Sequence, residues 1–204
     1  MSHAAFKAQR GLYKLKLKMK NIHELPKEVK QSILEHRKWI ENHKKGIRAD
    51  LSGVHLPEAN FSGVDLSRAY LPRAYLSGAN FSGAILSGAE SPGANFSGAD
   101  FSEAILFRAY LYVVDFAGAN LSGANFAGAD LTGANFSGAD LSEANFAGAN
   151  LSGANFAGAN FSGADFSEAV LFNLKIDDNA PSYILKAVRL YGKIRNILTA
   201  NKDE

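Results

Sequence analysis

Large apolar residues recur at every fifth position through most of this chain. Leu or Phe occupies each such position, here called a centre, from Leu51 to Leu171, and Ser91 is the single exception among the 25 centres. Ala or Val always lies two residues before a centre, and the spacing never slips. Self-similarity at a fixed period is the signature of a repeat array. The 204-residue chain therefore contains a long region built from copies of one small unit.

A period of five residues fits neither a regular helix nor a regular strand. Because a helix turns about 100° per residue, five steps rotate a side chain by about 140° and place successive centres on different faces. In a strand, an odd step moves the side chain to the opposite face. Gly usually lies two residues after a centre and Asn or Asp usually lies just before it, and these residue types tolerate tight turns. We therefore expect a stacked coil made of short sides.

The acidic residues that directly precede a centre indicate how many sides each coil has. In a stacked coil, like charges one layer apart would lie only about 4.8 Å from each other. Coils with three or five sides would align several of these acids in one column, whereas no two of the acids are separated by four repeats. A coil with four sides, one repeat to a side, avoids the repulsion. The acids are Asp50, Asp65, Glu90, Asp100, Asp115, Asp130, Asp140 and Asp165.

The alternation of Phe and Leu among the centres from Phe116 to Phe156 also requires an even number of sides. Four sides would bring every fourth centre into one column. The sequence then predicts one column containing Phe96, Phe116, Phe136 and Phe156, and an opposite column containing Phe126, Phe146 and Phe166.

Units such as Ala-Asn-Phe-Ala-Gly, residues 124–128, resemble the pentapeptide repeat family. The resemblance covers residues 49–173. It implies an all-β solenoid, a right-handed four-sided β-helix whose axis is filled by the centres and by the residues two before them. Twenty-five units would form about six coils. Stability in such a solenoid is spread along its length.

Open solenoid ends expose strand edges that promote aggregation unless they are covered. Residues 26–48 are predicted to form an N-terminal capping helix that begins near Pro26 and ends at Gly46. The run from Ile33 to Ile40, followed by Arg48-Ala49-Asp50-Leu51, also resembles the helix that precedes the repeats in some cyanobacterial members of the family. Residues 1–25 form a basic arm in which Lys alternates with apolar residues, a pattern that suits a membrane surface, a phosphate backbone or a solvated extension.

Residues 174–204 are predicted to contain a linker and a C-terminal helix with apolar residues at three-four spacing. We expect this helix to cap the solenoid. Because its apolar stripe is broader than capping requires, a helix that also forms a two-fold homodimer contact is the alternative. The residues of the stripe include Tyr183, Ala187, Leu190, Tyr191, Ile194 and Ile197.

Composition excludes several classes of chemistry. Cysteine is absent, so disulfides, thiolate nucleophiles and Cys-ligated zinc are excluded, and the composition fits a reducing compartment. The histidines lack H-E-x-x-H spacing, and no nucleophile elbow, phosphate loop or dinucleotide-binding turn is present. No apolar run approaches the roughly 18 residues of a membrane-spanning helix. We expect a cytoplasmic, non-enzymatic protein with no catalytic residue, no metal, no cofactor and no transmembrane segment.

The string Arg-Ala-Tyr-Leu occurs at residues 68–71, 73–76 and 108–111, where it interrupts the usual pattern of the repeats. The first and last copies are eight repeats apart, so two four-sided coils would place them on one side. Arg and Tyr are enriched in interface hot spots, and we predict a partner-binding surface here. Its residues are Arg68, Tyr70, Arg73, Tyr75, Glu90, Ser91, Arg108, Tyr110 and Tyr112.

Two alternatives remain open at this surface. In the first, the Arg and Tyr residues are present only because outward positions tolerate variation, and Glu90 forms ion pairs with the neighbouring Arg residues of the repeats. Ile85 and Ile105, next to Phe107, either extend the surface or pack under the N-terminal segment.

The charge distribution bears on two functional classes. Residues 1–48 carry 13 basic and 4 acidic side chains, residues 49–173 carry 3 and 12, and residues 174–204 carry 6 and 4. The first class is a scaffold that binds a protein partner. The second follows from the family's quinolone-resistance members, which act on gyrase and related type II topoisomerases by resembling DNA, as an acidic rod would. No direct nucleic-acid binding is expected from the acidic repeat region.

Overall fold

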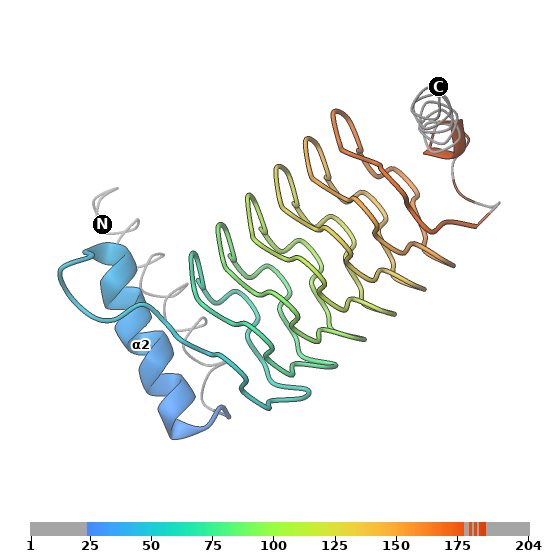
Figure 1. Cartoon of the computed structure of the whole chain (residues 1–204). Helices are drawn as coiled ribbons and strands as arrows, with labels where there is room; N and C mark the ends of the chain where they lie inside the picture. Colours follow the sequence, from blue (N-terminus) through green and yellow to red (C-terminus); the bar gives the residue numbers. More distant parts are fainter. Residues whose placement is uncertain (1–23, 178–179, 181, 183, 187–204) are drawn as a thin grey trace, which may run out of the picture.

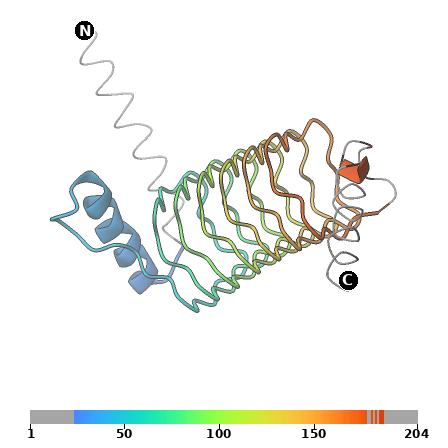
Figure 2. The ribbon, with the colours of Figure 1, turned by 45° about the horizontal axis from the view of Figure 1, so that its top comes forward.

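The computed structural model describes residues 24–177, 180, 182 and 184–186. Among these residues helix α2, Lys27–Glu41, comes first, and a stack of coils follows it (Figure 1). Viewed obliquely, the coils form an open-ended stack with α2 across the N-terminal end and the described C-terminal residues at the other end (Figure 2). The repeat region is therefore a solenoid.

The coils are joined by isolated parallel β-bridges, and each bridge joins two residues whose numbers differ by four repeats. The series begins with Asp50 and Tyr70 and ends with Asn155 and Lys175. Backbone N–H groups on each side donate to the next coil, as when the N–H of Leu71 donates to the carbonyl of Glu90 at 2.7 Å. One coil therefore contains four repeats, which confirms the four sides predicted from the acid spacing.

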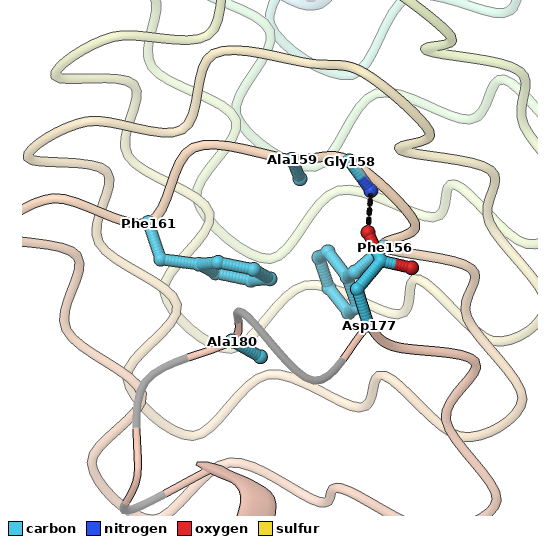
Figure 3. Close-up of a pocket in the computed structure, with 6 residues that line it drawn as sticks. All are labelled: Phe156, Gly158, Ala159, Phe161, Asp177 and Ala180. Carbon is cyan, nitrogen blue, oxygen red and sulfur yellow. Dashed lines mark hydrogen bonds between the residues drawn. The ribbon is translucent and has the colours of Figure 1, made fainter.

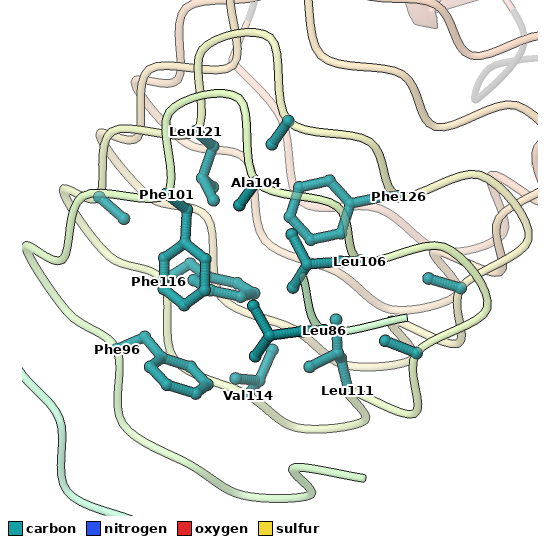
Figure 4. Packing of buried hydrophobic residues seen from close by; sticks show 14 of the residues in the cluster. Leu86, Phe96, Phe101, Ala104, Leu106, Leu111, Val114, Phe116, Leu121 and Phe126 are labelled. Carbon is teal, nitrogen blue, oxygen red and sulfur yellow. The ribbon is translucent and has the colours of Figure 1, made fainter. Parts of the chain in front are cut away.

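The axis is filled by the centres and by the Ala or Val residues two positions before them, nearly all of them fully buried. The predicted Phe columns are confirmed: Phe116 stacks on Phe96 and on Phe136 with centroid distances of 5.4 and 5.5 Å. Rings of the opposite column meet this column edge to face, as Phe126 meets Phe116 at 5.9 Å (Figure 4). Stacking within columns and edge contacts between them lock adjacent coils in register.

Helix α2 attaches to the first coil through an apolar face and one polar contact. Val29 and Ile33 belong to the same buried cluster as the axis of the coils. His36 is fully buried, and its Nδ1 accepts the N–H of Ala49 at 3.0 Å. Its Nε2 has no hydrogen-bond partner within the described part of the chain. This end of the solenoid is thus covered by apolar contacts and by a histidine acting as acceptor.

The helix is shorter than the sequence predicted. It ends at Glu41, and Asn42 is already extended. Gly46, expected to terminate the helix, instead lies in the following turn with φ of +74°, where a Cβ would clash with the carbonyl oxygen of Glu35. The chain turns back so tightly against α2 on its way to the first coil that only Gly fits at this place.

The predicted C-terminal helix falls mostly outside the described residues. Residues 182 and 184–186 are helical, and Ile184 is buried against the end of the core. The cap and dimer residues predicted in the tail, and the basic arm up to residue 23, lie outside the described part of the chain. Both remain predictions.

His36 makes the attachment of α2 sensitive to acid. Burial lowers the pKa of His36 below its ordinary value of 6.5. Well above pH 6.5 the imidazole of His36 is neutral in both the folded and the unfolded protein. As the pH falls toward the lower pKa of the folded protein, the imidazole of the unfolded chain is protonated first, so the free energy of unfolding decreases. We expect the urea midpoint, followed by fluorescence of the single tryptophan Trp39, to be lower at about pH 5.5 than at about pH 7.5.

His36→Gln is the matched control, because an amide oxygen can also accept the N–H of Ala49 but does not titrate. This variant is expected to have a smaller difference between the two midpoints. An equal difference in both proteins would show that other groups cause the acid sensitivity.

Candidate functional site

The β-bridges place the middle part of the predicted surface on one side of the solenoid, here called the first side. Tyr70 is bridged to Glu90, and Glu90 is bridged to Tyr110. The first and last Arg-Ala-Tyr-Leu strings therefore occupy equivalent places two coils apart, as the sequence predicted. From Asp50 to Asp130 acids and tyrosines alternate along this column, which then continues to Asn150 and Val170.

The arginines of the repeats stand at the corners that border the first side. Arg68 and Arg108 share one corner column, and Arg73 lies on the opposite corner of the side. All three have positive φ, between +52° and +59°, at a position usually occupied by Gly. Each lies over a Gly of the next coil; the Cγ of Arg68 is 3.5 Å from where a Cβ on Gly88 would stand. Gly in alternate coils therefore leaves room for the arginine side chains.

Exposed apolar side chains gather on and beside the first side. The described residues include ten large hydrophobic residues that are exposed, and seven of them lie between residues 70 and 113. Val113, at a corner with φ of +56°, is the most exposed of the seven at 60%, followed by Tyr110 at 58%. The seven are Tyr70, Tyr75, Ile105, Phe107, Tyr110, Tyr112 and Val113. These residues, with Arg48, Arg68, Arg73, Glu90 and Arg108, are called the Arg/Tyr surface below.

The Arg/Tyr surface continues onto the two neighbouring sides. Tyr75 stacks on His55 with a centroid distance of 4.6 Å on the second side. Phe107 lies near the end of the fourth side, and the guanidinium carbon of Arg108 is 5.0 Å from the centroid of its ring. Ile105, bridged to the half-buried Ile85, is 39% exposed. Ile105 therefore extends the apolar area.

Arg48 was not predicted to belong to this surface. Its Nη2 donates to Oε1 of Glu90 at 2.8 Å, and its guanidinium carbon lies 5.6 Å from the centroid of the Tyr70 ring. An open cavity of about 290 Å³ is lined by Arg48, Ala49, Asp50, Tyr70 and Glu90. The alternative that Glu90 pairs with arginines of the repeats is therefore wrong: its ion pair within the described residues is with Arg48, from the segment after α2.

Ser91 does not belong to the surface to which the sequence analysis assigned it. It is fully buried, because it occupies a centre and centres point toward the axis. Its Oγ has no hydrogen-bond partner among the residues that the structure describes. Ser91 therefore lies in the core beneath the Arg/Tyr surface, where its unpaired hydroxyl lowers the stability of the coils.

The aspartates that precede centres are part of the hydrogen bonding of the coils. The amide of Asn160 donates to Oδ1 of Asp140 one coil away at 3.0 Å, and Asn135 does the same to Asp115 at 2.9 Å. Hydrogen bonds from the backbone N–H and the hydroxyl of Ser142 lower the pKa of Asp140. These carboxylates therefore accept hydrogen bonds that join one coil to the next.

A second cavity, of about 180 Å³, lies at the C-terminal end of the coils (Figure 3). The carboxylate of Asp177 accepts the N–H of Gly158. One coil earlier, the equivalent N–H of Gly138 donates to the backbone carbonyl of Ala157. A side chain thus replaces the missing backbone partner at the last coil. The cavity belongs to the end of the solenoid and is lined by Phe156, Gly158, Ala159, Phe161, Asp177 and Ala180.

The described residues contain neither a metal-binding cluster nor a membrane-spanning helix. No group of three or more His, Asp or Glu residues among them is arranged to hold a metal ion. Within the same part of the chain, no helix has both the length and the apolar character needed to cross a membrane.

Comparisons with solved structures give several pentapeptide repeat proteins. HetL from the cyanobacterium Nostoc, involved in regulating heterocyst differentiation, is 24% identical over 72% of this chain and 97% of its own, with a TM-score of 0.32. QnrB1, a plasmid-mediated fluoroquinolone resistance protein, is 20% identical over 68% and 98%, with a TM-score of 0.40. A pentapeptide repeat protein of the Arabidopsis thaliana thylakoid lumen is 33% identical over 67% and 74%, with a TM-score of 0.27.

A comparison with curated protein sequences gave no match. Because the TM-scores are below 0.5, the assignment rests on the repeats themselves. The family model for pentapeptide repeats matches residues 47–83, 74–112, 109–146 and 134–171, together more than half of the chain. The period, the four-sided coil and this match agree, and the chain belongs to the pentapeptide repeat family.

Proposed function

We propose that this protein is a non-enzymatic scaffold that binds a protein partner through the Arg/Tyr surface. One observation carries the proposal. Seven exposed large apolar residues and all three arginines of the repeat region gather around one side of a rod whose other outward positions are mainly Asn, Asp, Ser and Gly. An apolar patch bordered by charged residues is the usual composition of a protein interface.

The backbone at the corners supports the same proposal. A residue other than Gly with positive φ costs on the order of 1–3 kcal/mol, and such residues persist where function requires them. Of the nine described residues other than Gly with positive φ, Arg68, Arg73, Arg108 and the β-branched Val113 border the first side, and glutamates such as Glu103 have the same conformation at other corners. Gly would relieve the strain at each of these corners. Val113 is the unusual residue among them, because a β-branched side chain is a genuine outlier at positive φ, and its exposed side chain beside the first side fits contact with a partner.

The proposal predicts that restoring the repeat consensus abolishes partner capture without unfolding the protein. In the variant, Tyr70→Asn, Arg108→Gly and Tyr110→Asn are combined. These changes remove exposed hot-spot types, so we expect affinity for the captured partner to fall by about 100-fold or more. The melting temperature should change little, because none of the three side chains belongs to the buried core and the strain at residue 108 is relieved. Affinity capture with purified variants measures the loss.

The matched control changes three residues on the third side: Asp100→Asn, Glu103→Gly and Asp140→Asn. It carries the same number of consensus changes and is expected to capture the partner as the unaltered protein does. Undiminished capture by the first-side variant, or an equal loss in the control, would refute the proposal.

The alternative, a DNA-mimicking modulator of a type II topoisomerase such as gyrase, would use the acidic coils instead. Residues 109–174 contain six acidic and no basic side chains, which favours it. Duplex DNA, however, carries about one charge per 1.7 Å of axis, and here no two of the acids that precede centres are bridged to each other between adjacent coils. A gyrase supercoiling assay at two salt concentrations distinguishes the two, since mimicry requires salt-sensitive inhibition or quinolone protection near enzyme stoichiometry.

A further inference from the structure

The Arg/Tyr surface contains one unit of two side chains twice along the axis of the solenoid. Arg68 with Tyr70 and Arg108 with Tyr110 occupy the same corner and the same side, separated by one intervening coil. Successive hydrogen-bonded coils are about 4.8 Å apart, so the two units are separated by about 9.6 Å along the axis. Gly88 lies at the intervening corner, between the two arginines. A partner that contacts both units must therefore present equivalent side chains at two places about this distance apart.

An α-helix repeats one face at nearly this distance. Seven residues of helix rise about 10.5 Å and complete almost two turns, so residues seven apart lie on one face. In an extended strand, three residues span about 10 Å but end on the opposite face, and two or four residues span about 7 or about 13 Å. The spacing of the two units thus favours a helix lying along the first side.

The charge of the two units defines the chemistry of the partner face. Neither Arg68 nor Arg108 forms an ion pair with any residue in the described part of the chain. Tyr70 and Tyr110, beside them on the first side, are 39% and 58% exposed. Carboxylates facing the arginines and apolar side chains facing the tyrosines would complement this arrangement.

Arg48 neutralises the acidic residue in the coil between the two units. Glu90 lies between Tyr70 and Tyr110 in the column, where a free carboxylate would repel an acidic partner. The ion pair with Arg48 neutralises Glu90. The segment that follows α2 therefore keeps the middle of the surface compatible with negative charge.

We propose that the first side binds an amphipathic acidic helix of a partner protein, with carboxylates seven residues apart on Arg68 and Arg108 and an adjoining apolar stripe on Tyr70 and Tyr110. This inference rests on the proposed function, and it adds the partner's conformation, charge and period. A partner with a basic face or an extended chain does not match the two units.

Two helical peptides of about 18 residues, five turns of helix, test the period directly. They have identical composition, but one has Glu at every seventh position with Leu three or four residues later, and the other has Glu at every fifth position. Fluorescence anisotropy with the full-length protein is expected to give at least about tenfold tighter binding of the first peptide. In the variant Arg68→Gly with Arg108→Gly, this preference should disappear.

Arg73→Gly is the matched control, because it makes the same change at the opposite corner of the first side and should leave the preference intact. Arg48→Ala should also weaken binding of the first peptide, although Arg48 does not contact the peptide. Glu90 is then left unpaired, and its carboxylate repels the acidic peptide. Glycine is the usual corner residue, so all the glycine variants are expected to fold.

Equal binding of the two peptides, a preference that survives loss of both arginines, binding of neither peptide, or tighter binding of a single-stranded oligonucleotide would each overturn the inference. Capture of a natural partner is measured separately with the consensus variant. A partner captured by the Arg/Tyr surface but lacking such a helix would overturn this inference and leave the proposed function standing.

Discussion

Phe116→Ala is expected to destabilise the protein by about 3–5 kcal/mol, the usual cost of removing a buried Phe from a packed core. Phe116 is fully buried and contacts four other rings. It stacks between Phe96 and Phe136, and it meets Phe101 and Phe126 edge to face at 5.3 and 5.9 Å. Its loss removes stacking contacts within its own column, which join successive coils, and edge contacts with rings on two other sides.

The same substitution at the C-terminal end is the control. Phe166 is 8% exposed and stacks on Phe146 alone in its column among the described residues. Stability in a solenoid is a sum over neighbouring repeats, so Phe166→Ala should cost less and loosen only the last coils. Guanidinium unfolding with hydrogen exchange measures both effects. Equal cost and equally widespread exchange in the two variants would contradict a stack of locally coupled coils.

Ser91→Leu is expected to raise the stability by about 2 kcal/mol. A buried hydroxyl without a partner costs about 1–3 kcal/mol, and a fully buried Leu contributes about 1.5–3 kcal/mol. Ser91 lies in the axis between Leu71 and Leu111 of the adjoining coils, where every other centre from 51 to 171 is Leu or Phe. At about 2–4 °C per kcal/mol for a protein of this size, the melting temperature should rise by roughly 5 °C.

Ser91→Ala separates the two contributions to this gain. It removes the hydroxyl but fills no space, and it is expected to give about half of the gain, near 1 kcal/mol. Thermal unfolding of the two variants makes the comparison. If the Leu variant were less stable than the Ala variant, the coils would already have closed around Ser91 and Leu would overpack the axis.

The coil itself was predictable because each repeat constrains the next. A five-residue period cannot continue without turning, and the acids avoid one another only if a coil has four sides. The Phe columns followed from the same arithmetic, since Phe116 and Phe136 are one coil apart. Where the chain repeats itself, pattern and structure agree closely.

Two of the errors lie where repetition stops, and two lie at unusual residues within the repeats. The end of α2 and the ion pair of Arg48 with Glu90, 42 residues apart, depend on the path of a connection that has no repeat to constrain it. Ser91 was assigned to the surface because it is an unusual residue, although its position in the period places it in the axis. Val113 was missed because an exposed Val at a corner with positive φ is contrary to the usual preference of the backbone.

One coil offers a direct test of where a partner binds. The residue after each centre faces outward, and Tyr112, Ala117, Ser122 and Ala127 occupy this position on the four successive sides. A photo-cross-linking amino acid placed at each in turn samples the whole perimeter at one height. We predict an adduct of one discrete mass from position 112 and none above background from position 122. Equal adducts from all four positions, or the strongest from position 122, would contradict binding through the Arg/Tyr surface.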